Sequence, residues 1–187
     1  MKIEILSSDG IQASEKDAIE RMREVFNASD LTRNWHGYAA FMMMDVVYRD
    51  REIDLLLLTH DRVLLVELKK WNGTISASGD HWLLNGNDMG RSPVKVLADK
   101  WKILSSKVKN ALKKSAQPAW IDYRVVLCGN ASNAGVPDDE RPRVISLDYL
   151  LKLATRGAYE KEFKRVPTDF VNPTDHIADS GVAALVQ

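Results

Sequence analysis

Three charged residues lie at the ends of two strongly apolar segments, and two of them are of the type that binds divalent cations. Asp54 precedes the apolar run 55–58. Glu67 and Lys69 end the apolar run that starts at Val63. Runs of Leu and Val this dense indicate strands buried on both faces, where polar side chains are costly. Two carboxylates side by side repel each other, which favours a bound divalent cation between them.

The predicted pairing of the two segments brings these residues together. If residues 59–62 form the turn of a hairpin, Asp54 lies directly opposite Glu67. Directly opposed residues have Cβ atoms about 4.5–5.5 Å apart. Residues two positions apart in a strand share a face, so Lys69 points the same way as Glu67. A one-residue bulge would turn Asp54 to the other face, so the predicted site depends on this register.

The composition of the chain is that of one globular domain. Its 187 residues are enough to bury a substantial core, and 45% of them are hydrophobic and 28% charged. The formal net charge is 0, so any basic surface that binds nucleic acid must be local. We see no signal-peptide run and no apolar stretch of about 18 residues, which predicts a soluble cytoplasmic protein without membrane contact. The single cysteine, Cys128, lies in an apolar run and indicates a buried, inert thiol.

Hydrophobic periodicity predicts further elements on either side of the central hairpin. Residues 1–6 form a short strand, and a helix is expected from Ser14 with Asp17 as its capping partner. A strand is expected over 41–48, and a second, small hairpin over 74–84.

Glu15 is a further acidic residue whose position fits the predicted site. It lies four residues before Ile19 and seven before Met22, so it points along the inward face of the first helix. The alternative is a first-turn acid that is simply favoured by the helix dipole. From the residues alone, both interpretations stay open.

A long helix starts at Ser92-Pro93, a serine cap followed by proline, and is expected to run to about Lys114. Its lysines form two rows at seven-residue spacing, Lys95, Lys102 and Lys109 in one and Lys100, Lys107 and Lys114 in the other. Lysines on an exposed helix face usually only contact water. Here Asp99 is the sole acid between Lys95 and Lys114, so a phosphate-contacting surface is an equal alternative.

The last part of the chain predicts two strands and one helix. The strands cover 123–128 and 144–145, and residues 130–141 form a polar loop between them. The helix covers 147–155, with Ser146 as its cap and Gly157 as its stop.

This order of elements predicts an α/β sandwich around one mixed sheet, with an antiparallel meander at its centre. The predicted domain covers residues 1–167. Residues 168–187 show no periodicity and indicate a mobile tail or the start of a linker.

Asp54, the sequence Glu67-Leu68-Lys69 and the following Trp71-Asn72-Gly73 resemble the signature of the PD-(D/E)xK nuclease superfamily. More narrowly, they resemble the NERD (nuclease-related) domain, and the similarity covers roughly residues 14–155. The resemblance implies a restriction-endonuclease-like three-layer sandwich. In that family a glutamate on the first helix joins the site, and Ser14-Glu15 matches it.

One position departs from the family pattern. Family members often carry Asn-Pro-x-x-Gln at the start of the helix after Glu-x-Lys, whereas Val96 stands here where glutamine would be. A polar contact near the site is thereby lost, and Lys95 is its charged neighbour.

The resemblance implies a divalent-metal-dependent deoxyribonuclease that hydrolyses phosphodiester bonds. Asp54 and Glu67 would hold Mg²⁺ or Mn²⁺, with the backbone carbonyl of Leu68 as a third oxygen ligand. Lys69 would orient or deprotonate the attacking water, or stabilise the charge of the phosphorane. Glu15 would reach the metal directly or through water. The products would carry a 5′-phosphate and a 3′-hydroxyl.

Two other interpretations are kept open. The charged residues could be an ordinary ion-paired patch at the end of a sheet. The domain could also be a non-catalytic nucleic-acid-binding or assembly module of a larger DNA-processing or defence protein, in line with the neutral net charge and Val96.

The predicted partner is DNA, contacted by Lys95, Lys102 and Lys109, with RNA as an alternative. A second copy of the chain and a fused helicase or kinase module are further candidates. The chain itself shows no Gly-x-x-x-x-Gly-Lys loop and no kinase motif.

Overall fold

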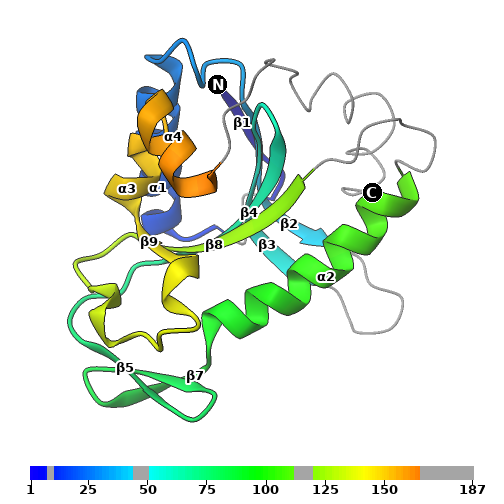
Figure 1. Ribbon diagram of the computed structural model, residues 1–187. Helices are drawn as coiled ribbons and strands as arrows, with labels where there is room; N and C mark the ends of the chain where they lie inside the picture. The colour runs from blue at the N-terminus through cyan, green and yellow to red at the C-terminus, as the bar shows by residue number, and fades with distance from the viewer. Residues whose placement is uncertain (8–10, 44–50, 112–119, 165–187) are drawn as a thin grey trace.

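The protein is built on a six-stranded mixed sheet with helices on both faces (Figure 1). The structure is a computed structural model and describes residues 1–7, 11–43, 51–111 and 120–164, without the side chains of 109–111. The strand order is β1-β2-β3-β4-β8-β9. The strands are β1 (Lys2–Ile5), β2 (His36–Met43), β3 (Arg51–Leu58), β4 (Arg62–Lys69), β8 (Trp120–Leu127) and β9 (Val144–Ser146).

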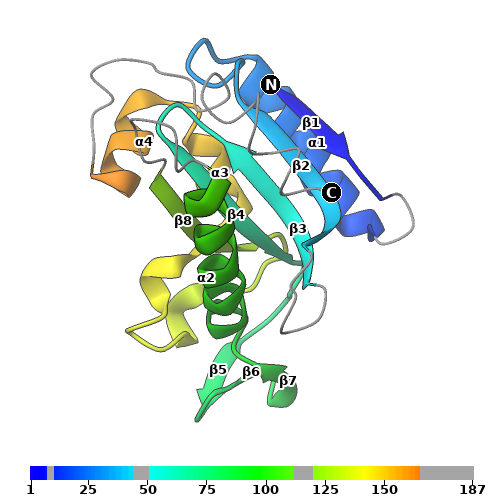
Figure 2. The ribbon, with the colours of Figure 1, turned by 90° about the vertical axis from the view of Figure 1, so that its right-hand side faces the viewer.

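The helices form one layer on each face of this sheet, as Figures 1 and 2 show from two sides. They are α1 (Ala13–Asn27), α2 (Pro93–Ala111), α3 (Leu147–Lys152) and α4 (Arg156–Phe163). On one face, α1, α3 and α4 share a core with Leu64 and Val66 of β4. On the other face, α2 shares a second core with Val63 and Leu65. This arrangement confirms the predicted three-layer α/β sandwich.

The antiparallel meander β2-β3-β4 has the predicted register. Leu58 pairs with Val63, and the β3–β4 ladder continues to Leu55 opposite Val66. The outer strands are parallel to their neighbours: β1 to β2, β8 to β4 and β9 to β8. The long apolar runs follow from this topology, because a central strand covered on both faces must be apolar on both.

At Asp54 the regular pairing of β3 is interrupted towards both of its neighbouring strands. The β3–β4 ladder ends one step before Asp54 and Glu67, so the predicted direct opposition of these two residues lies just beyond the paired region. On the other side, the β2–β3 pairing omits Asp54 and Ala40, and Ala40 has a left-handed backbone with φ of 53°. Residues with a Cβ rarely adopt this conformation, and such strain is concentrated at functional sites.

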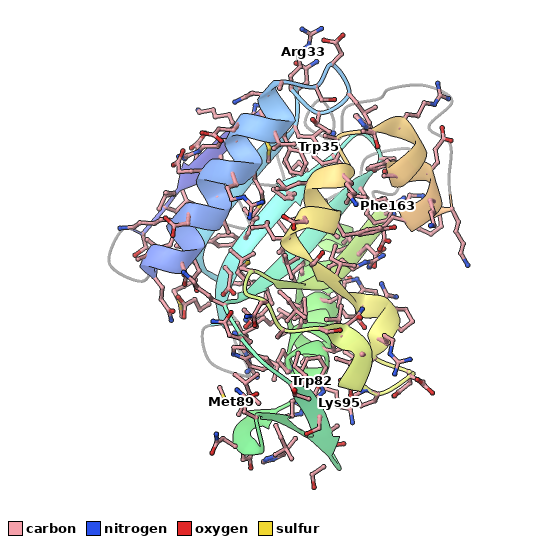
Figure 3. All side chains as sticks on the ribbon, turned by 90° about the vertical axis from the view of Figure 1, so that its left-hand side faces the viewer. Arg33, Trp35, Trp82, Met89, Lys95 and Phe163 are labelled. Carbon is pink, nitrogen blue, oxygen red and sulfur yellow. The ribbon has the colours of Figure 1, made fainter. Side chains whose placement is uncertain are left out.

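A separate antiparallel sheet follows β4 and projects beyond the end of the main sheet (Figure 2). Its strands are β5 (Ile75–Ser78), β6 (His81–Leu84) and β7 (Asn87–Arg91). The predicted hairpin of β5 and β6 is confirmed, whereas β7 was not predicted. Figure 3 shows Trp82, Met89 and Lys95 at this end of the molecule and Trp35 and Phe163 at the opposite end.

The first helix begins differently from the prediction. Its N-cap is Gln12, and the capping box pairs Gln12 with Glu15 rather than Ser14 with Asp17. The reason is that Glu15 is the third residue of α1, from which a carboxylate can reach back to the cap backbone.

The second long helix begins as predicted. The backbone N–H of Lys95 donates to the Ser92 hydroxyl at 3.3 Å, which makes Ser92 the cap of α2. The described part of this helix ends at Ala111, and Lys114 lies outside the described residues.

The two predicted strands and the start of the predicted helix are confirmed, but α3 ends at Lys152 rather than at residue 155, and α4 was not predicted. Ser146 caps α3 and its hydroxyl accepts a hydrogen bond from the Tyr149 N–H. Gly157 lies inside α4 rather than at the end of a helix, so its predicted role as a stop is wrong. Tyr159 of α4 is 1% exposed, and burial of this large side chain outweighs the modest cost of a helical glycine.

Two short 3₁₀ helices, η1 (Asn133–Gly135) and η2 (Arg141–Arg143), lie in or next to the segment that was predicted to be a loop. The predicted strand residues 44–48 and the tail 168–187 lie outside the described residues. Within the part of the chain that the structure describes, no helix is long and apolar enough to cross a membrane.

The end of β4 that lies away from Lys69 is closed by a network of arginines. Arg62 and Arg124 both pair with Asp122, at 3.6 and 3.0 Å. Their guanidinium carbons lie over the ring of Phe163, at 3.8 and 5.4 Å from its centroid. These contacts attach α4 to the sheet. The buried arginine charges are tolerated because they are paired with carboxylates.

His60 is buried in the turn beside this network. It is 8% exposed, and the Trp35 indole N–H donates to a ring nitrogen at 3.2 Å. Burial lowers the pKa of His60 to about 4, although Asp61 opposes the shift. The imidazole is therefore neutral in the native protein at neutral pH.

We predict that His60 makes the protein less stable in acid. In the unfolded chain the His60 pKa returns to about 6.5, so the unfolded state binds the extra proton as the pH falls from 6.5 towards 4. The contribution of His60 to the free energy of unfolding is nearly constant above about pH 7.5, and about 2 kcal/mol of it is lost between pH 7 and pH 4.5. Urea unfolding at both pH values measures the change.

The His60→Gln variant should lose about 2 kcal/mol less than the wild type over this interval. His81→Gln is the matched control, because His81 is exposed on β6. Equal losses in the wild type and in His60→Gln would contradict the assignment.

Candidate active site

Asp54 and Glu67 meet where β3 and β4 separate. The Oδ2 atom of Asp54 accepts a hydrogen bond from the backbone N–H of Leu68 at 2.8 Å. This bond takes the place of the next ladder bond between the strands. The sequence-predicted neighbourhood of Asp54 and Glu67 is therefore present, although a carboxylate–backbone contact rather than regular strand pairing makes it.

Glu67 lies between two lysines. Lys69 contacts its Oε1 atom at 2.8 Å, and Lys100 of α2 contacts its Oε2 atom at 2.6 Å. Glu67 and Lys100 are each only 7% exposed, so this is a buried cluster rather than a surface ion pair. Glu67 faces α2 because it alternates in β4 with Leu68, which packs on the α1 side.

Lys100 was not predicted as a site residue, and its assignment to an exposed row with Lys107 and Lys114 is wrong. The spacing of Lys100 from its apolar neighbours does predict that it faces the sheet. Lys100 lies three residues after Leu97 and four before Leu104, and both leucines are in the core beneath α2. Positions at these spacings share one helix face, so Lys100 faces the sheet.

The charges of the cluster shift one another's protonation. Burial, together with the Glu67 carboxylate, raises the pKa of Asp54 to about 6. Burial also opposes the ionisation of Glu67, but Lys100 and Lys69 outweigh it and lower the pKa of that carboxyl. Burial likewise opposes the charge of Lys69, but Glu67 outweighs it and raises the Lys69 pKa. At neutral pH Lys69 is therefore an ammonium group and cannot accept a proton.

The donor atoms fit a hard divalent cation. Asp54 and Glu67 supply carboxylate oxygens. The N–H and C=O of one strand residue point to the same side, so the Leu68 carbonyl points with its N–H towards Asp54 and β3. Oxygen-only ligand sets suit Mg²⁺ or Mn²⁺ rather than zinc. Because both oxygens of Glu67 contact lysines, a cation bound by Glu67 must displace at least one of these contacts.

Glu15 lies near this cluster but does not join it. Its Oε2 atom accepts a hydrogen bond from the Gln12 N–H at 2.9 Å, which is a helix-capping role. Glu15 also lines a pocket of about 180 Å³ with Lys69, Trp71 and Cys128. Among the described residues, no three or more His, Cys, Asp or Glu side chains form a group that could hold a metal. A role for Glu15 as an outer metal ligand stays a prediction.

The predicted row of phosphate-contacting lysines has acidic partners. Lys95 pairs with Asp80, in the turn between β5 and β6, and lies 3.6 Å from Glu140. Lys102 pairs with Asp99 at 3.3 Å. The side chain of Lys109 lies outside the described residues. Contact of these lysines with nucleic acid stays a prediction.

The backbone beyond Lys69 is held by contacts that were not predicted. The side chain of Asn72 accepts from the Asn130 N–H, and the side chain of Asn130 accepts from the Gly73 N–H, both at 2.9 Å. A Cβ atom on Gly129 would lie 2.0 Å from the Trp71 carbonyl oxygen, so only glycine fits there. These contacts lock the end of β4 to the end of β8 and thereby position Lys69.

Cys128 lies at the same junction. Burial raises the pKa of its thiol to about 11, so the thiol is protonated at neutral pH and is a weak nucleophile. The thiol is partly buried rather than fully buried as predicted, and its raised pKa agrees with the prediction that it is inert.

Comparison with solved structures finds the crystal structure of protein VC1899 from Vibrio cholerae, with 12% sequence identity and a TM-score of 0.36. The aligned region covers 79% of the present chain but only 32% of that chain. A similarity this weak carries no argument about activity. No curated protein matches the sequence.

Comparison with protein families gives a clear result. Residues 12–128 match the nuclease-related domain, NERD. This segment spans α1 through β8 and contains Asp54, Glu67, Lys69 and Lys100. Because it makes up well over half of the sequence, the chain belongs to the NERD family of nuclease-related domains.

Proposed function

We propose that this protein is a divalent-metal-dependent nuclease that hydrolyses phosphodiester bonds in DNA. One observation carries the proposal: the half-buried Asp54 and the buried Glu67 lie together where the β3–β4 pairing ends, and a lysine contacts Glu67. The membership of the chain in a nuclease-related family supports this function for the cluster.

Asp54, Glu67 and the Leu68 carbonyl would hold Mg²⁺ or Mn²⁺. When bound, such an ion neutralises phosphate charge and lowers the pKa of a coordinated water. Asp54 must be ionised to bind the cation, and its pKa of about 6 leaves it mostly ionised at neutral pH.

Lys69 acts as an ammonium group in this proposal. Its raised pKa argues against a role as general base and favours the other two predicted roles. It orients the attacking water by hydrogen bonding, or it stabilises the negative charge that develops on the phosphorane. Preorganised donors of this kind commonly contribute a factor of about 10² or more to the rate.

A second candidate function is a nucleic-acid-binding or assembly module without catalysis. The two ion pairs of Glu67 favour this second function, because Lys69 and Lys100 already neutralise both of its carboxylate oxygens. Salt-dependent DNA binding without cleavage in Mg²⁺, Mn²⁺ or Co²⁺ would select this function.

We expect Asp54→Asn and Lys69→Met to lower the rate of DNA cleavage by about 100-fold or more, because the first removes a carboxylate that would hold the cation and the second removes the ammonium group that acts at the reacting phosphate. Cleavage of linear and supercoiled DNA in Mg²⁺ and in Mn²⁺ measures the effect. Lys152→Met, on the exposed side of α3, is the matched control and should cut like the wild type. Equal cleavage by all four proteins would show that the activity lies elsewhere.

We also expect Mn²⁺ to stabilise the wild type against unfolding. A ligand that binds only the native state at about 100 times its Kd adds about 2.7 kcal/mol to the unfolding free energy. Asp54→Asn should lose this increment, whereas Asp88→Asn, an exposed aspartate of β7, should keep it. Thermal unfolding with and without Mn²⁺ gives the comparison, and an equal shift in Asp54→Asn would exclude Asp54 as a ligand.

A further inference from the structure

We propose that Lys100 is a second lysine of the site, which divalent-cation binding releases from Glu67 and which then binds the phosphate group of the substrate. This inference rests on the proposed function for the cation and the substrate class. It adds a residue that links the two binding events.

The position of Lys100 is the first argument. Its side chain is 7% exposed, and it reaches from α2 across to β4, where its ammonium group lies 2.6 Å from Glu67 Oε2. It is also close enough to Asp54 for its positive charge to oppose, in small part, the rise in the pKa of that carboxyl. Lys100 therefore contacts one of the two carboxylates that the proposed function assigns to the cation and lies near the other.

The charge of the cluster is the second argument. The formal charges of Asp54, Glu67, Lys69 and Lys100 cancel without a cation. A divalent ion on the two carboxylates would leave an excess of two positive charges in a buried site. An ammonium group hydrogen-bonded to one of those carboxylates is then repelled by the ion, and its hydrogen bond competes with metal ligation.

Of the two lysines, Lys100 is the one that has to leave. The backbone of Lys69 is fixed in β4, where its carbonyl accepts from the Cys128 N–H at 2.9 Å. Lys69 also lines a pocket with Glu15, which is not one of the three proposed ligands and leaves Lys69 an acidic neighbour when the cation binds. The acid next to Lys100 in sequence, Asp99, pairs instead with Arg91 and Lys102.

The released ammonium group needs a new anion, because an unpaired buried charge is costly. The phosphodiester that approaches the cation supplies one, and the flexible four-carbon stem of a lysine can follow it. Cation and phosphate should therefore bind with positive coupling that depends on Lys100. If Lys100 merely anchors α2 to the sheet, its removal should lower stability without changing this coupling.

Calcium titration of the wild type, Lys100→Met and Lys152→Met tests the inference, with and without a 20-base-pair DNA duplex. Calcium takes the same type of oxygen ligands, and a gel after each titration checks that the duplex is intact. Lys100→Met should bind Ca²⁺ alone at least fivefold more tightly than the wild type. The gain in Ca²⁺ affinity caused by the duplex should be at least fivefold smaller in Lys100→Met, whereas Lys152→Met should match the wild type.

A second measurement follows the lysine itself. The NMR signal of the Lys100 ammonium group, assigned by its loss in Lys100→Met, should shift on addition of Ca²⁺ and shift again with the duplex. Lys100→Arg keeps the positive charge and should retain most of the coupling. Thermal unfolding of each variant confirms that it is folded.

The outcomes separate this inference from the proposed function. Unchanged Ca²⁺ affinity and coupling in a folded Lys100→Met, with an unmoved Lys100 signal, would overturn the inference even if the wild type cuts DNA. A wild type that shows the coupling but cuts no DNA in Mg²⁺ or Mn²⁺ would overturn the nuclease and leave the role of Lys100 standing. A wild type that binds no Ca²⁺ and no Mn²⁺ would overturn both.

Discussion

The candidate site depends on one hydrogen bond, from the Leu68 N–H to the Asp54 carboxylate. If the β3–β4 ladder continued, this N–H would pair with a backbone carbonyl and the two strands would stay closed. The carboxylate satisfies the donor instead, so the strands can separate without leaving a buried N–H unpaired. The same bond orients Asp54 and leaves the Leu68 carbonyl facing the space between β3 and β4. Across β3, the left-handed Ala40 accommodates the distortion at a cost of about 1–2 kcal/mol.

The second determinant is the balance of charge around Glu67. A buried carboxylate is tolerated when hydrogen bonds and opposite charges compensate it, and Lys69 and Lys100 do so from different layers of the fold. One lysine belongs to the sheet and the other to α2, so the electrostatics of the site depend on how this helix packs. A small displacement of α2 would change the environment of Glu67 even though the helix supplies none of the proposed metal ligands.

The sequence alone was enough to predict the pairing of β3 with β4 at the centre of the sheet, because two dense apolar runs around a short polar turn can form a hairpin in one simple register. It was not enough for Lys100, since the seven-residue lysine spacing suggested an exposed row and its offset from Leu97 and Leu104 was overlooked. The capping role of Glu15 requires the course of the backbone at Gln12. The contact of Gly129 with Trp71 joins residues far apart in sequence, and no local pattern encodes such a contact.

The strand β4 has a different kind of charge at each of its ends. Arg62, at its start, belongs to a paired network that attaches α4, whereas Lys69, at its end, belongs to the candidate site. Seven residues of extended chain separate these ends by about 23 Å, more than twice the distance of about 10 Å beyond which substitutions without shared partners usually act additively. Substitutions at the two ends should therefore act independently and additively. Substitutions around Arg62 could therefore change the stability of the domain while the candidate site around Lys69 stays the same.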